Sequence, residues 1–179
     1  DKWDVACESY RMNHPDTEVI CADIREIKDF PEADIVFGSP PCQDLSHANN
    51  KRKMDTSLLE EFLRVAQIVK PEFWVTENVY YARHAYKKLG IPYQVINARD
   101  CGLPQNRKRI FGGKLPLILL PRVIQKTVPC ITATEYKGCG KDKRRAARYF
   151  GRKILIDEAK FYQGFPAHYY FAGNPMEQY

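Results

Sequence analysis

Residues 33–43 read Ala33-Asp34-Ile35-Val36-Phe37-Gly38-Ser39-Pro40-Pro41-Cys42-Gln43, a short apolar run that ends in two prolines and a cysteine. Isoleucine, valine and phenylalanine in succession favour a buried β-strand. The two prolines cannot donate hydrogen bonds to a sheet, and they hold the residue before them extended, so the strand has to end there. The stretch therefore predicts a strand that presents the Cys42 thiol on a stiff corner.

Around this corner the chain alternates short apolar runs with amphipathic segments. Helical spacing predicts helices over residues 3–12, 58–69, 79–89 and 156–162, and apolar runs predict strands over residues 18–21, 33–37, 73–75 and 93–97. Strands that alternate with helices pair in parallel and form a doubly wound sheet. Such sheets bind ligands beyond the carboxyl ends of their strands, where Cys42 and Glu77 are both expected.

The segment after residue 97 carries polar side chains at every second position. Gln105, Arg107 and Arg109 share one face if the segment is extended. From the residues alone this face is either part of a site or a solvated edge whose arginines prevent strand pairing.

Composition limits the class of protein and of partner. The chain has 179 residues and a mass of 20.8 kDa, which suits one globular domain. It carries 28 Lys plus Arg against 22 Asp plus Glu, for a net charge of +6 and a pI near 9.0. The basic residues gather in residues 51–53, 107–109 and 137–153, a distribution that favours a polyanionic partner.

Neither a membrane anchor nor a metal centre is expected. No apolar stretch is long enough to span a bilayer, and residues 1–30 lack the order of a signal peptide, so we expect a soluble, intracellular, cytoplasmic protein. The six cysteines include no Cys-x-x-Cys pair and no histidines at metal-ligand spacing, so we expect reduced thiols and no metal site.

A cysteine and a glutamate at neighbouring strand ends allow two kinds of chemistry. A Cys-His hydrolase is disfavoured, because only His47 lies near Cys42 in the sequence and no residue is marked as its orienting partner. The better match is addition of a thiolate to carbon 6 of a cytosine, which makes carbon 5 nucleophilic toward a methyl donor. A glutamate can then hold the ring nitrogen and exocyclic amine, and an arginine the ring oxygen.

Three motifs, in order, carry a resemblance to a known family. The motifs Gly38-Ser-Pro-Pro-Cys42-Gln43, Thr76-Glu77-Asn78-Val79 and Asn97-Ala-x-Asp-x-Gly-x-Pro-Gln105-x-Arg107-x-Arg109 resemble the Pro-Cys-Gln, Glu-Asn-Val and Gln-x-Arg-x-Arg motifs of the DNA cytosine-5 methyltransferases. Cys130-Ile-Thr-Ala-Thr and residues 158–166 resemble the ninth motif of that family and the segment after it. The resemblance covers nearly the whole chain.

The resemblance implies an α/β fold, with a Rossmann-like S-adenosylmethionine-dependent methyltransferase sheet and a small, reduced second subdomain. Residues 1–113 would form the catalytic core, residues 114–153 a reduced connector or target-recognition region, and residues 154–179 a C-terminal segment that returns to the core.

The resemblance also implies roles for individual residues. Cys42 is the expected nucleophile, Glu77 binds and activates the base, Arg109 contacts the base oxygen, and Arg107 supports the cysteine pocket. The expected partner is DNA, whose cytosine has to be flipped out of the helix to reach the thiol. The residues expected to contact the nucleic acid are Gln43, Ser46, Lys51, Arg52, Lys53 and Gln105. The residues expected to bind the donor, S-adenosylmethionine, are Asp23, Ile24, Pro40 and Leu58.

Departures from the family pattern leave alternatives open. The first motif, a strand followed by Phe-x-Gly-x-Gly, and the tenth, a Gly-Asn segment, have no counterpart, so we expect an incomplete donor site. A short connector replaces the target recognition domain between Phe111 and Cys130, which predicts weak sequence specificity. The alternatives are an RNA (tRNA) cytosine-5 methyltransferase and a catalytically inactive fragment that binds nucleic acid.

Overall fold

The computed structural model describes residues 1–41, 55–115, 126–132 and 149–173, and these divide into two compact units. The sheet unit comprises Ile27–Asn97 and Lys108–Pro121, and the helical unit comprises Asp1–Glu26, Ala98–Arg107 and Arg122–Tyr179. Within the described part of the chain, no helix is both long and apolar enough to cross a membrane. The domain boundaries predicted at residues 113 and 153 stay predictions.

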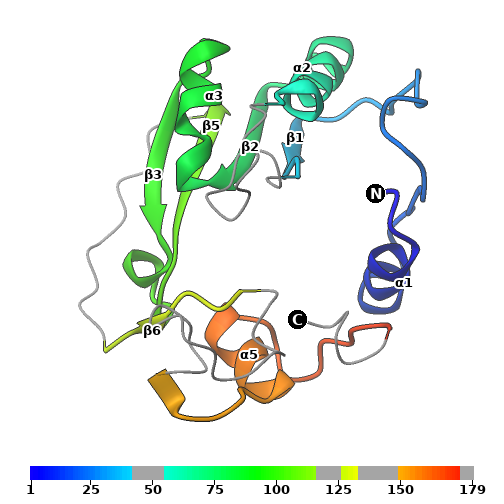
Figure 1. The fold of residues 1–179 in the computed structure, drawn as a ribbon. Coiled ribbons are helices and arrows are strands. Elements are labelled where there is room, and N and C mark those ends of the chain that lie inside the picture. The colour runs from blue at the N-terminus through cyan, green and yellow to red at the C-terminus, as the bar shows by residue number, and fades with distance from the viewer. Residues whose placement is uncertain (42–54, 116–125, 133–148, 174–179) are drawn as a thin grey trace. The chain divides into compact units, whose positions relative to one another are not determined.

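The sheet unit is built on four strands in the order β1-β2-β5-β3, with β5 between β2 and β3 (Figure 1). The strands are β1 (Ile35–Gly38), β2 (Phe73–Val79), β3 (Tyr93–Asn97) and β5 (Lys108–Lys114). β1 and β2 are parallel as predicted, but β5 runs antiparallel to both of its neighbours, so the expectation of wholly parallel pairing is wrong. The reason is the connection before β5, which contains no crossover helix of the kind that parallel pairing requires.

Strand β2 is longer than its apolar run. The run at residues 73–75 predicts a strand that ends before Glu77, whereas the ladder with β5 continues through Val79. Glu77 pairs with Phe111, and the next residue, Asn78, pairs with Ile110. Backbone pairing across the sheet, which the local sequence does not encode, therefore places the polar residues within the strand.

Two helices pack on the sheet through one hydrophobic core. Helix α2 (Ser57–Val69) matches its prediction and ends at Lys70, whose φ of 51° and N–H donation to Ala66 close the last turn. The single helix predicted at residues 79–89 is instead a 3₁₀ turn, η1 (Tyr80–Ala82), followed by α3 (Arg83–Lys88). The core contains Leu59, Ala82, Ala85, Tyr86, Ile91 and Ile110.

Two glycines allow side chains to lie directly against the strands. A Cβ at Gly38 would overlap the ring of Phe62 from α2. A Cβ at Gly112 would lie 2.6 Å from the ring of Tyr86 and 2.9 Å from the carbonyl oxygen of Pro92. The absence of a side chain at these positions lets aromatic rings fill the space against the sheet.

The helical unit contains short elements. They are α1 (Asp4–Asn13), η2 (Ala98–Cys101), the two-residue parallel pair β4 (Gln105–Asn106) and β6 (Val128–Pro129), and α5 (Ile156–Gln163). Helix α5 confirms its prediction: the Glu158 carboxylate accepts a hydrogen bond from the N–H of Leu155, and Gly164, with φ 81°, ends the helix. A second cluster of buried residues packs Ile131 and Ile154 against Ala159 of this helix.

The strand predicted at residues 18–21 is wrong, and the apolar face predicted for α1 is only partly correct. Among the described residues, the backbone near Ile20 bonds to Asp1 and to the Arg11 side chain and has no strand beside it, so no ladder can form. Trp3 and Tyr10 are 48% and 46% exposed, and Cys7 is the buried residue of α1.

Candidate active site

Glu77 and Arg109 form an ion pair on neighbouring strands of the sheet unit. The Nε atom of Arg109 lies 2.9 Å from a carboxylate oxygen of Glu77, and the two side chains are 19% and 23% exposed respectively. Arg109 is directly opposite Val79, and Glu77 and Val79 point to the same side of β2, so Arg109 and Glu77 are diagonal neighbours across the ladder. The sheet register thus brings together the two residues predicted to hold a base.

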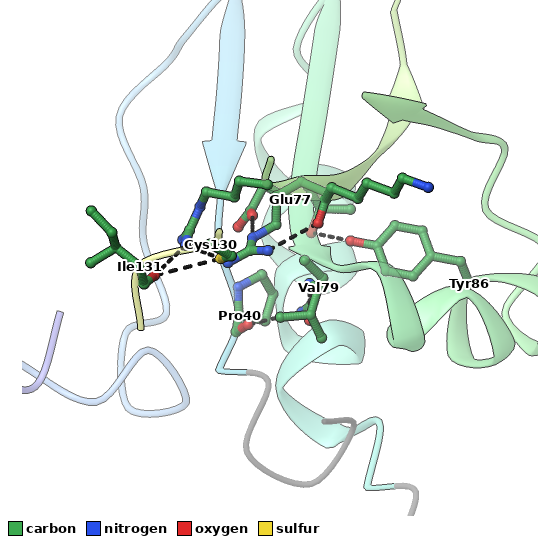
Figure 2. Close-up of polar contacts among 11 residues, drawn as sticks. Pro40, Glu77, Val79, Tyr86, Cys130 and Ile131 are labelled. Atoms are coloured by element: carbon green, nitrogen blue, oxygen red, sulfur yellow. Dashed lines mark hydrogen bonds and ion pairs between the residues drawn. The ribbon is translucent and has the colours of Figure 1, made fainter. Parts of the chain in front are cut away.

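Asn78 connects this strand to the segment that precedes Cys42. Its Nδ2 donates a hydrogen bond to the carbonyl oxygen of Pro40 at 3.0 Å, and its Oδ1 accepts one from the N–H of Val79 at 2.9 Å (Figure 2). The side chain is only 2% exposed. Both ends of the buried amide are therefore satisfied, and the end of β1 is fixed beside the strand that carries Glu77.

Tyr86 supports the same strand from α3. Its hydroxyl lies 3.2 Å from the hydroxyl of Thr76, the residue before Glu77, and both side chains are fully buried (Figure 2). Burial is the main reason that the pKa of Tyr86 is raised to about 12. The hydrogen bond with Thr76 lowers this pKa in part, and the charge of Glu77 raises it. Tyr86 therefore stays neutral and holds Thr76 at physiological pH.

Several of the residues predicted from the sequence lie outside the described part of the chain. These are Cys42, Gln43, Ser46, Lys51, Arg52 and Lys53. Their proposed roles stay predictions.

Arg107 and Gln105 belong to the helical unit and contact protein groups there. Arg107 donates to the Sγ atom of Cys130 at 3.3 Å and to the carbonyl oxygen of Ile131 at 3.1 Å (Figure 2). Gln105 is fully buried and donates to the carbonyl oxygen of Tyr162 at 2.9 Å. Within this unit they tie β4 to β6 and α5, while their predicted support of the cysteine pocket and contact with nucleic acid remain untested.

The residues predicted to bind the donor are divided between the units. Asp23 and Ile24 belong to the helical unit, and Pro40 and Leu58 to the sheet unit. The Asp23 carboxylate accepts hydrogen bonds from the side chain and the N–H of Arg25. The side-chain hydrogen bond with Arg25 is the main reason that the pKa of Asp23 lies well below its usual range, so this carboxylate is ionised at neutral pH.

Two contributors to the site received no role from the sequence. Asn78 stands in the quoted Thr-Glu-Asn-Val motif, so its position could have been flagged, but its partner Pro40 is distant in the sequence. Tyr86 carries no signal beyond its helical spacing.

A comparison with protein-family models identifies the group to which this arrangement belongs. The model described as "C-5 cytosine-specific DNA methylase" matches residues 1–113. The chain belongs to the C-5 cytosine-specific DNA methylase family. The match includes both residues of the Glu77–Arg109 pair and the Pro40 segment bound by Asn78.

Curated relatives of this methylase family point the same way. The chain is 36% identical to the type II methyltransferase M.AquIA of Picosynechococcus sp., in a match that covers 61% of this chain and 59% of that protein. It is 38% identical to the type II methyltransferase M.NgoPII of Neisseria gonorrhoeae, over 58% of this chain and 36% of that protein. The chain thus spans less than two thirds of the length of either relative.

Solved methyltransferase structures share the fold. The Entamoeba histolytica methyltransferase EhMeth matches with a TM-score of 0.69 and 17% identity, over 99% of this chain and 81% of that chain. A DNMT2 mutant from Spodoptera frugiperda matches with a TM-score of 0.54 and 17% identity, over 99% and 83%. These matches confirm the predicted methyltransferase fold.

Proposed function

We propose that this chain carries the base-binding part of a DNA cytosine-5 methyltransferase, with Cys42 as the nucleophile. The observation that carries the proposal is the 2.9 Å contact between Glu77 and Arg109, two polar groups suited to neighbouring positions on the polar edge of a cytosine ring. Asn78 adds a link to Pro40, two residues before Cys42. Membership of the methylase family supports the reaction type.

In the proposed reaction, the Cys42 thiolate forms a bond to carbon 6 of a flipped cytosine. The electron pair of the C5–C6 double bond moves into the ring, so that negative charge grows at the ring nitrogen and oxygen while carbon 5 becomes nucleophilic. Glu77 hydrogen-bonds the ring nitrogen N3 and the exocyclic amine. Arg109 donates to the carbonyl oxygen on carbon 2. These two groups are already oriented by the sheet, which reduces the reorganisation that the step requires.

The residues predicted for the donor fit S-adenosylmethionine by their chemistry. The ionised Asp23 carboxylate can accept a hydrogen bond from the adenine amine, and Ile24, Pro40 and Leu58 offer apolar contacts. When bound, S-adenosylmethionine supplies an electrophilic methyl group on a sulfonium.

The experiment follows the first step alone. Addition of a thiolate to carbon 6 lets carbon 5 exchange its hydrogen with water, so a duplex that carries tritium at carbon 5 of cytosine reports addition in the absence of a donor. We expect the 179-residue chain to release tritium. We expect Cys42→Ala to abolish release and Glu77→Gln to slow it by about 10²-fold, the order found when one preorganised group is removed from a charge-stabilising site.

A matched control lies on the approach to the same strand. Glu72 is exposed and precedes β2, so Glu72→Gln should release tritium at the wild-type rate. Equal release by the wild type and Cys42→Ala would contradict the proposal. Faster release from labelled single-stranded or transfer RNA than from the DNA duplex would replace DNA with RNA as the substrate.

A further inference from the structure

Two cysteines distant in the sequence meet in the helical unit, away from the proposed nucleophile. Cys7 lies in α1 and is 1% exposed, while Cys21 lies on the irregular segment after α1 and is exposed. Burial raises the pKa of the Cys7 thiol, and an interaction with the Cys21 thiol raises it further, so the two side chains are neighbours. The pairing is unexpected from the sequence, which contains no Cys-x-x-Cys motif.

Backbone contacts of Asp1 hold the two cysteine-bearing segments together. The carbonyl oxygen of Asp1 accepts from the Sγ atom of Cys7 at 3.4 Å and from the N–H of Ala22, the neighbour of Cys21, at 2.9 Å. The amino group of Asp1 donates to the carbonyl oxygen of Ile20, on the other side of Cys21, at 3.3 Å. The backbone on both sides of Cys21 is thus anchored at the point where the Cys7 thiol arrives.

We propose that Cys7 and Cys21 form a redox modification site that a low-molecular-weight disulfide such as oxidised glutathione converts into an intramolecular disulfide. The difference in exposure between the two thiols sets the order of events. Cys21 is exposed and reacts first with the oxidant, whereas Cys7 is buried and is shielded from it.

The exchange balances in two steps. The Cys21 thiolate attacks one sulfur of glutathione disulfide, forms a mixed disulfide and releases one glutathione thiolate, which takes up the proton that Cys21 lost. Cys7 then loses its proton, attacks the Cys21 sulfur and releases the second glutathione. The two cysteines together lose two electrons, and one glutathione disulfide becomes two thiols.

The second step is favoured by proximity and slowed by burial. The carbonyl oxygen of Asp1 holds the Cys7 thiol beside the backbone that carries Cys21, so attack within the chain competes well with attack by free thiols. Burial raises the pKa of Cys7, which reduces the fraction of thiolate and makes the step faster as pH rises. The product bond would tie α1 to the backbone two residues before Asp23.

To test the proposal, the 179-residue chain is treated with glutathione disulfide and the remaining thiols are blocked by alkylation. Disulfide-linked peptides are then mapped by mass spectrometry. In the wild type we expect a Cys7–Cys21 link in at least about tenfold excess over glutathione-bound Cys21, since the resolving thiol is held in place. Cys101→Ser, which removes an exposed cysteine elsewhere in the same unit, should form the same link to the same extent.

Two variants separate the steps. Cys21→Ser, at an exposed position, should leave Cys7 unmodified. Cys7→Ser should accumulate glutathione on Cys21, because no thiol remains to resolve it. The proposal would be overturned if glutathione-bound Cys21 were as abundant in the wild type as in Cys7→Ser. A disulfide from Cys7 or Cys21 to another cysteine would overturn it as well. The measurement is independent of methyl transfer, so it stands apart from the proposed function.

Discussion

Glu77 and Asp23, two acidic residues with proposed roles, are held in different ways. Glu77 lies within a β-strand, its backbone is paired with Phe111, and the side chains on either side of it are buried and hydrogen-bonded. Asp23 lies on irregular backbone and is held by Arg25, two residues away. The position of the Glu77 side chain therefore depends on packing across the sheet. The position of the Asp23 side chain depends on a local polar contact.

The same difference extends through the two units. The described part of the sheet unit has a four-stranded ladder and a six-residue buried core. The helical unit, in its described part, pairs only two residues of β4 with two of β6, and it has the ion pairs Asp23–Arg25 on irregular backbone and Arg152–Glu158 at the start of α5. Substitutions that alter packing should therefore cost most in the sheet unit, and loss of a surface charge should cost little in the helical unit.

The largest effect is expected at Gly113 of β5. This residue has φ 143°, and a Cβ there would overlap the carbonyl oxygen of Trp74 on β2. Gly113→Ala should lower the free energy of unfolding by about 3 kcal/mol or more, because backbone strain and a clash with backbone add together. Urea denaturation followed by circular dichroism measures the change.

The matched control for Gly113 is Gly90 in the same unit. It has φ 67°, and no atom lies within 4 Å of a Cβ built there. Gly90→Ala should cost only about 1 kcal/mol, the penalty of the left-handed conformation itself. Equal losses of unfolding free energy in Gly113→Ala and Gly90→Ala would show that close packing between β5 and β2 does not make the sheet unit sensitive to substitution.

A smaller effect is expected at Asn78. Asn78→Asp keeps the size of the side chain but replaces the donor that binds Pro40 with an acceptor. The free energy of unfolding should fall by about 2 kcal/mol, because a buried carbonyl loses its partner. Tritium exchange at cytosine should slow as well, since the segment before Cys42 loses its anchor.

Asn106 provides the comparison for Asn78. It is exposed, so Asn106→Asp should leave stability within about 0.5 kcal/mol of the wild type. Wild-type stability together with wild-type exchange in Asn78→Asp would argue against the anchoring role of Asn78.

The smallest effect is expected at Glu158 of the helical unit. The side-chain hydrogen bond from Arg152 is the main reason that the pKa of Glu158 falls from 4.5 to about 2, and the N–H of Leu155 adds to it. Because the folded pKa lies below the unfolded value, the stabilisation is present above pH 4.5 and is lost as pH falls toward 2. Glu158→Gln should cost about 1 kcal/mol at most at pH 7, since solvent screens the half-exposed Arg152.

The pH dependence of unfolding distinguishes this ion pair from its neighbours. Urea denaturation at pH 7, 4 and 3 should show the difference between the wild type and Glu158→Gln shrinking as pH falls. Asp157→Asn, at a side chain that is 90% exposed, serves as the control and should change stability less. A difference for Glu158→Gln that grows on acidification would contradict the assignment.

Much of the secondary structure could be predicted because it depends on neighbours in the sequence. The apolar run before Pro40 and Pro41 predicted β1, and helical spacing predicted α2 and α5. The strand predicted at residues 18–21 failed because a strand also needs a partner, and Ile20 bonds to Asp1 instead. The antiparallel direction of β5 was missed for a similar reason, since it depends on the connection before it.

The sequence by itself determined the family, because the cysteine, glutamate and arginine motifs occur in a fixed order along the chain, and the family-model match confirms it. It also predicted an alternation of side chains along residues 105–109, and Asn106 and Lys108 are exposed whereas Gln105 is buried. Only the tertiary structure decided that Arg109 contacts Glu77, that Asn78 binds Pro40 and that Asp1 holds the Cys7 thiol beside the segment of Cys21. Such contacts join residues whose separation along the chain carries no periodic signal, because sheet register and backbone hydrogen bonds between distant segments set them.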